Sequence, residues 1–253
     1  MTSIVTSMST AQIAALSTKQ IAALSTTDIA ALSTSQAGVL STAQIAALST
    51  ADVVSLSTAA IAAFNASQLK ALGADDVASL ATAQVAALSS SQVTAFSTAQ
   101  IAAMTTSQVG ALAGNMSTAQ INVLSTAQIA GVSTTTMAAL STTQLAAIST
   151  KDIAALSTAQ LSAVSTTNLA ALSTAQITAM TTAQVGALAA NMSTTQIGAL
   201  TTAQTAGLTT TVISSLATAQ LQAISTKDIA ALSTTQAAGL STTVPVSYTH
   251  LTL

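Results

Sequence analysis

The chain of 253 residues contains no cysteine, tryptophan, arginine or glutamate, and only one histidine, one tyrosine and one proline. Without cysteine it forms no disulfide, thiolate metal site or cysteine nucleophile. A single histidine excludes a multi-histidine metal site, and four lysines provide no basic surface for nucleic acid. We therefore predict a non-enzymatic protein with no catalytic, cofactor-binding or metal-binding residues and no nucleic-acid partner.

Long apolar runs are also missing, although the mean hydropathy is positive. A membrane-spanning helix needs about 20 predominantly apolar residues. Here a typical apolar run is short, as at 13–16, where Ser17 and Thr18 follow directly. We therefore predict no transmembrane helix. The first residues, 1–6, have neither a basic segment nor an apolar core, so they do not predict a secretory signal peptide.

What the sequence does contain is an eight-residue repeat close to Ile-Ala-Ala-Leu-Ser-Thr-Ala-Gln. We count 28 units from Ile13 and a partial unit at Val5 and Met8. Two units carry four extra residues, 113–116 and 189–192. A longer period is superimposed, because residues 101–120 match residues 177–196 at 16 of 20 positions, an offset of 76.

These periods divide the chain into an N-terminal partial repeat (1–12), a repeat region (13–243) and a tail without repeats (244–253). The tail holds the chain's only proline, tyrosine and histidine. Its last eight residues, 246–253, resemble the translation of a transposase sequencing adaptor. That resemblance implies that the tail is an artefact of a sequencing library, so it is excluded from the prediction of fold and site.

An eight-residue period excludes one continuous helix, because the apolar positions would drift by about 80° per repeat. It also fits a flat strand poorly, since the isoleucine and leucine three residues apart would lie on opposite faces. A β-solenoid with a corner in each unit remains an alternative, but alanine and glutamine are disfavoured in strands.

Short helices fit the repeat better. Serine or threonine followed three residues later by glutamine is the capping-box pattern at a helix start, as in Ser17 with Gln20. Isoleucine and leucine three residues apart share one face of a helix. Such short helices need neighbours, which is the property of a solenoid. We predict an all-α solenoid or superhelix of two-turn helices, one per octad, with each four-residue insertion lengthening one helix by about a turn.

The octads also resemble repeat regions of very large bacterial secreted or surface proteins, many with adhesin-like or haem-utilisation-like names. The resemblance covers about residues 5–243 and rests on the motif Ser/Thr-x-x-Gln-Ile-x-x-Leu. It implies an extracellular or cell-surface location and a spacer or adhesive stalk. Haem binding is not supported, because the only candidate axial ligands are methionines and His250.

The few unusual side chains receive structural interpretations. We expect the acids to have a helix-capping role, most of them in place of glutamine, rather than to bind calcium, which needs clustered carboxylates. The methionines at apolar positions should pack in the core, the lysines beside the cap should be solvated, and two asparagines should end the lengthened helices. These residues are Asp28, Asp52, Asp75, Asp76, Asp152, Asp228, Met104, Met116, Met180, Met192, Lys19, Lys151, Lys227, Asn115 and Asn191.

The leading functional hypothesis is a structural repeat that acts as a spacer or adhesive stalk of a larger extracellular protein. The alternative is a solenoid that binds a protein or peptide, and a remote alternative is a threonine ladder that binds ice. The low net charge of −2 leaves self-association or a cell-surface component as partners to consider.

Overall fold

The computed structural model describes residues 3–240, and every regular element in this range is helical. The range contains 28 α-helices and three 3-10 helices, so the predicted all-α solenoid and the count of 28 units from Ile13 are confirmed. The β-solenoid alternative is wrong for these residues. The chain divides into two compact units, Met1–Thr136 (unit 1) and Met137–Leu253 (unit 2), which are described separately.

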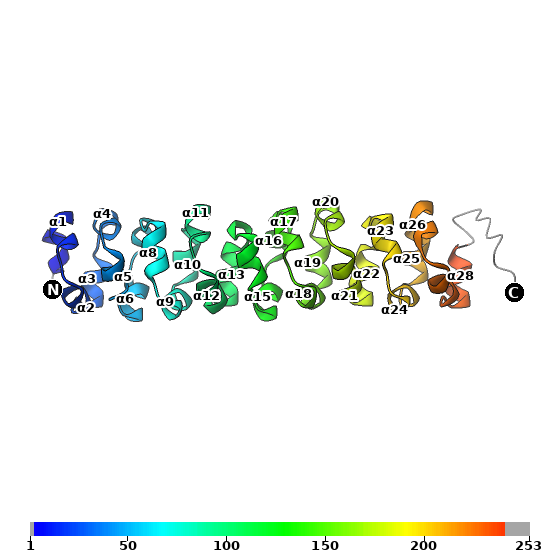
Figure 1. The fold of residues 1–253 in the computed structure, drawn as a ribbon, viewed down its shortest axis with the longest axis horizontal. Coiled ribbons are helices and arrows are strands. Elements are labelled where there is room, and N and C mark those ends of the chain that lie inside the picture. The colour runs from blue at the N-terminus through cyan, green and yellow to red at the C-terminus, as the bar shows by residue number, and fades with distance from the viewer. Residues whose placement is uncertain (1–2, 241–253) are drawn as a thin grey trace. The chain divides into compact units, whose positions relative to one another are not determined.

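The helices follow one another along the sequence as drawn in Figure 1. Unit 1 contains η1 (Ile4–Ser7), α1 (Thr10–Ala14), α2 (Thr18–Ala22), α3 (Thr26–Ala30), α4 (Thr34–Gly38), α5 (Thr42–Ile45), α6 (Thr50–Ser55), α7 (Thr58–Ala62), α8 (Ala66–Ala71), α9 (Ala74–Ser79), α10 (Thr82–Ala86), α11 (Ser90–Val93), α12 (Thr98–Ala103), α13 (Thr106–Leu112), η2 (Ala113–Asn115), α14 (Thr118–Asn122) and α15 (Thr126–Ala130). Helix α16 (Thr134–Ala139) includes residues of both units. Unit 2 contains α17 (Thr142–Ala146), α18 (Thr150–Ala155), α19 (Thr158–Ser162), α20 (Thr166–Ala170), α21 (Thr174–Ala179), α22 (Thr182–Leu188), η3 (Ala189–Asn191), α23 (Thr194–Gly198), α24 (Thr202–Ala206), α25 (Thr210–Ser215), α26 (Thr218–Ala223), α27 (Thr226–Ala230) and α28 (Thr234–Leu240).

Most helices begin at the serine or threonine that the repeat supplies, and the N-caps of α8, α9, α10 and α26 are Asn65, Gly73, Ala81 and Ala217. At α2, the Gln20 backbone N–H donates to Ser17 Oγ over 3.2 Å, and the Ser17 N–H donates to Gln20 Oε1 over 2.9 Å. The predicted capping box is therefore present. The helices end without any residue of positive φ in the described range, and in most cases the serine or threonine that caps the next helix follows the helix end. They are four to seven residues long, shorter than the two turns expected.

The core of each unit is made of the isoleucine and leucine positions of the octads. Ile13, Ile21 and Ile29 have no exposed surface, and Phe64, at a leucine position, is 1% exposed. Small residues let neighbouring helices come close. At Gly207 an added Cβ would lie 2.7 Å from Thr182 Cγ2, so this glycine is required by the close approach of α22 and α24.

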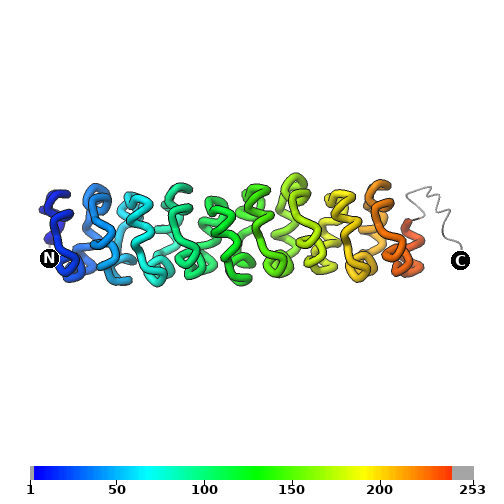
Figure 2. Tube along the Cα trace, viewed as in Figure 1, coloured from blue at the N-terminus to red at the C-terminus, as the bar shows by residue number. Residues whose placement is uncertain are grey.

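Successive turns of each unit stack with a regular offset. In unit 1 each of the first helices contacts the helix three positions later, as α1 contacts α4 and α3 contacts α6. Side-chain hydrogen bonds reach the helix four positions away, because Gln44 Nε2 of α5 donates to the carbonyl oxygen of Ile13 in α1 and to that of Leu16, two residues after α1 ends. A turn therefore holds between three and four helices, and Figure 2 shows the repeated coils of the Cα trace in both units.

The prediction that the four-residue insertions lengthen a helix is wrong. Helix α22 ends at Leu188, and the insertion forms the separate 3-10 helix η3. Ala189 (0% exposed) and Met192 (4% exposed) occupy the core as the isoleucine and leucine of an octad do. Helix α25 contacts η3, at the offset that links ordinary helices. The insertion is therefore half a repeat that takes the place of a whole helix in the stack.

The first described residues pack against the repeats that follow them. Val5, in η1, is completely buried, and Gln36 Nε2 donates to the carbonyl oxygens of Val5 and Met8, both over 2.8 Å. The tail at 244–253 lies outside the described residues. Among residues 3–240, no helix is long and apolar enough to cross a membrane.

Candidate functional site

The glutamine at the third position of most helices is the most regular polar feature of the fold. Its Oε1 accepts from the capping residue of its own helix, and its Nε2 donates to the end of an earlier helix. Gln44 Oε1 accepts from the Ser41 N–H over 2.7 Å. Gln44 Nε2 donates to the carbonyl oxygens of Ile13 over 3.0 Å and Leu16 over 2.8 Å. One side chain thus closes its own helix cap and joins two turns.

The same arrangement recurs along both units, and we call these residues the turn-spanning glutamines. All except Gln92 are buried. Those whose Nε2 donates to carbonyl oxygens 24 to 31 residues earlier are Gln36, Gln44, Gln68, Gln84, Gln92, Gln100, Gln108, Gln120, Gln128, Gln176, Gln184, Gln196, Gln204, Gln220 and Gln236.

Sequence reasoning found the capping half of this role and missed the other half. The sequence did contain a signal for this second role. Either glutamine or glutamate can complete a capping box, yet the chain has no glutamate. Only an amide has the Nε2 donor that the carbonyl oxygens of the earlier turn require. A glutamate there would bring a buried carboxylate against those oxygens, which costs several kcal/mol, about 3–5 for an uncompensated buried charge.

The aspartates that replace glutamine cap their helices as predicted, but two of them, Asp76 and Asp228, make a different contact between turns. Asp76 Oδ1 accepts from Thr50 Oγ1 over 2.9 Å, and Asp228 Oδ1 accepts from Thr202 Oγ1 over 2.7 Å. In both pairs the threonine begins the helix three positions earlier. A carboxylate can only accept, so its partner is a hydroxyl of that helix rather than a carbonyl four helices back.

Hydrogen bonds from hydroxyl groups lower the pKa of two aspartates, Asp28 and Asp228. The Ser25 hydroxyl, then the Ser3 hydroxyl, donate to Asp28 and lower the pKa of its carboxyl from 3.8 to about 2. Hydroxyl donation by Ser225 and then by Thr202 likewise lowers the pKa of Asp228. In each case the bonds favour the charged form.

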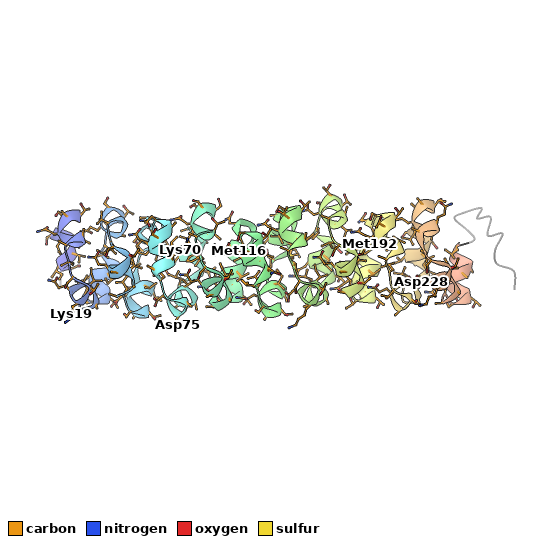
Figure 3. All side chains as sticks on the ribbon, in the orientation of Figure 1. Lys19, Lys70, Asp75, Met116, Met192 and Asp228 are labelled. Atoms are coloured by element: carbon orange, nitrogen blue, oxygen red, sulfur yellow. The ribbon has the colours of Figure 1, made fainter. Side chains whose placement is uncertain are left out.

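The methionines, lysines and asparagines named in the sequence analysis have structural positions. Met104, Met116, Met180 and Met192 are 3–4% exposed, so their predicted packing in the core is confirmed. Lys19, Lys151 and Lys227 are exposed, as expected, and Figure 3 marks Lys19 together with the exposed Lys70 and Asp75. Asn115 and Asn191 end the 3-10 helices η2 and η3 rather than lengthened α-helices.

Two further observations concern metal-binding groups and unpaired polar atoms among the described residues. Residues 3–240 contain no group of three or more histidine, aspartate or glutamate side chains able to hold a metal ion. Thr205 Oγ1 is buried without a hydrogen-bond partner, because this threonine of α24 stands at a core position that isoleucine, valine or leucine fills in most octads.

Comparison with known proteins identifies the repeat. A family model described as the ALTTAQ repeat matches residues 2–26, 21–50, 45–82, 77–113 and 153–190, more than half of the chain. The chain belongs to the ALTTAQ repeat family. No curated protein matches it.

The six letters of the ALTTAQ repeat occur unchanged at residues 199–204. They run from a core leucine, Leu200, through the capping Thr201 to the turn-spanning Gln204. The ALTTAQ sequence therefore covers the junction between two helices: the end of one, the cap of the next, and the amide that joins turns.

Proposed function

We propose that this chain is a non-enzymatic spacer or stalk segment of a larger extracellular protein. The observation that carries the proposal is the uniformity of the contact between turns. Most octads supply an amide donor, and the end of an octad supplies the carbonyl acceptor of a later glutamine, as Leu80 does for Gln108. A segment built in this way can be extended by whole repeats without a new kind of contact, which is what a spacer requires.

The exposed surface supports the same proposal. The two copies of the longer repeat, 101–120 and 177–196, differ at four positions, and all four are exposed in both copies. The replacements exchange alanine, glycine, serine and threonine. A binding surface built for one partner concentrates aromatic and arginine side chains, whereas the chain has 1% aromatic residues and no arginine.

The test compares the full chain with a variant that lacks residues 117–192. This deletion joins Met116 to Ser193, whose following residues through Gln196 repeat the cap of Ser117. Because the chain has no cysteine, Ala11→Cys and Thr235→Cys give a unique label pair on exposed residues. We expect the shortened chain to keep its helical content per residue and its urea midpoint, with a smaller distance between labels by pulsed electron paramagnetic resonance.

A matched control lacks residues 117–196, which removes the cap as well and joins Met116 to Ile197. This deletion should lower stability, because α23 loses its capping serine and its glutamine. The spacer proposal fails if the in-phase deletion changes stability as much as the control, or leaves the label distance unchanged. Capture of one protein that binds the full chain saturably, and loses binding on the in-phase deletion, would favour a binding module instead.

A further inference from the structure

Asn115 and Asn191 have no structural role in the described residues. Each is the last residue of a 3-10 helix and is exposed. Asparagine often ends a helix in the left-handed conformation, but no residue here has positive φ. Neither carboxamide makes a hydrogen bond within the described residues, whereas Asn65 caps α8, accepting at Oδ1 from the Ser67 and Gln68 backbone N–H groups over 2.9 and 3.0 Å.

The two asparagines share a chemical context. Each is followed by methionine and then serine, at 115–117 and 191–193. The residue before the asparagine differs between the copies, Gly114 and Ala190, while Asn-Met-Ser is the same. Asparagine followed by any residue except proline, and then by serine or threonine, is the acceptor pattern for N-linked sugar.

The geometry presents this pattern to solvent. Met116 is 3% exposed and anchors the chain to the core, so the asparagine before it projects from a fixed backbone. Met116 and Ser117 are extended, with φ of −74° and −71°. A Cβ added at Gly114 would meet no atom within 4 Å, which leaves open space beside Asn115.

We infer that Asn115 and Asn191 are acceptor sites for an N-linked sugar. The donor class is a sugar with a diphosphate leaving group at C1, carried by a nucleoside or by a lipid. The Asn Nδ2–C1 bond forms, the C1–O bond to the diphosphate breaks, the diphosphate leaves with the electron pair, and a base of the transferase takes one Nδ2 proton. The inference is independent of the spacer role.

The test incubates the folded full chain with two enzymes in separate arms. One arm uses a soluble asparagine glycosyltransferase with UDP-glucose, and the other a purified oligosaccharyltransferase with a lipid-linked oligosaccharide. Peptide mass spectrometry then measures the occupancy of each asparagine. We expect sugar at Asn115 and Asn191 in at least one arm, and lower occupancy at Asn65, because its carboxamide is held by the cap.

Variants separate the acceptor role from folding. Asn115→Gln with Asn191→Gln should abolish modification at these sites without changing the thermal midpoint, and Asn122→Gln, at an exposed asparagine outside the pattern, should change neither. Ser117→Asp keeps a capping acceptor but removes the hydroxyl and should abolish modification of Asn115, whereas Ser117→Thr should retain it. The inference is overturned if neither arm modifies the folded chain while an Asn-Ala-Ser peptide is modified, or if only the urea-unfolded chain reacts.

Discussion

Replacing Gln68 by glutamate separates the two roles of a turn-spanning glutamine. The introduced carboxylate can still accept from the Asn65 N–H, which donates to Gln68 Oε1 over 2.7 Å. It cannot donate to the carbonyl oxygens of Ala37 and Leu40, now bonded to Nε2 over 3.0 and 2.7 Å. The side chain is 1% exposed, so the charge would be buried beside acceptors.

The expected loss in the free energy of unfolding follows from these contacts. Each lost hydrogen bond is worth about 1 kcal/mol, and an uncompensated buried charge raises the total to about 3–5 kcal/mol. The matched control is Gln12→Glu, because Gln12 forms the same capping box with Ser9 but is exposed and has no bond to another turn. There a carboxylate at the helix start should change stability by less than about 1 kcal/mol, in the stabilising direction.

The loss should also depend on pH. Burial and the facing carbonyl oxygens raise the folded-state pKa of the introduced carboxyl above its unfolded value of about 4.3. Because the folded pKa is the higher one, the variant is most stable below the unfolded pKa and loses stability as pH rises through the folded pKa. Urea unfolding followed by circular dichroism at pH 4 and pH 7 measures this. Equal losses for Gln68→Glu and Gln12→Glu, or a loss independent of pH, would refute the turn-spanning role.

Three further predictions follow from single positions. Thr205→Val should raise the free energy of unfolding by about 1–3 kcal/mol, because it removes a buried hydroxyl without a partner, and an unchanged urea midpoint would contradict it. Gly207→Ala should destabilise unit 2, since its Cβ would lie 2.7 Å from Thr182 Cγ2, whereas Gly186→Ala meets no atom within 4 Å and should stabilise α22 by about 1 kcal/mol; thermal unfolding that ranks the two variants in the opposite order would refute the packing argument. The depressed pKa of Asp28 stabilises the fold at neutral pH, and this contribution should be lost as pH falls from 3.8 towards about 2; an acid titration in which Asp28→Asn unfolds along the same curve as the unchanged chain would count against it.

The start and the buried face of each helix can be predicted from the sequence of one octad. Ser17 with Gln20 predicts a helix start, and Ile21 with Leu24 predicts its buried face, because these interactions lie within a few residues of one another. The contact between turns cannot be predicted from one octad. Gln108 reaches Val77 and Leu80, 31 and 28 residues earlier, and that separation depends on how many helices complete a turn. Identical octads carry no information about which neighbour lies above which.

The structure of the half repeats, residues 113–116 and 189–192, could not be predicted from the local sequence either. The four residues at 189–192, Ala-Ala-Asn-Met, are compatible with one more turn of α-helix, which was the expectation. The chain instead forms η3, because Ala189 and Met192 can then bury where an isoleucine and a leucine would lie. Gln220 then finds the carbonyl oxygens of these two residues at 3.0 and 2.7 Å. The deciding interaction comes from a residue 28 positions later and is invisible in the local sequence.

This bonding scheme explains how duplication can lengthen the chain without disrupting its fold. Most octads bring a donor at their glutamine, and each brings carbonyl acceptors at its last turn, so any whole number of added octads leaves each later glutamine with an equivalent carbonyl. A half repeat preserves that order because it still contributes acceptors, as η3 does for Gln220. It contributes no glutamine, however, so the carbonyl oxygen of Val164, four elements before η3, receives no glutamine donor among the described residues. A half repeat therefore costs one contact between turns while leaving the order of all later contacts unchanged.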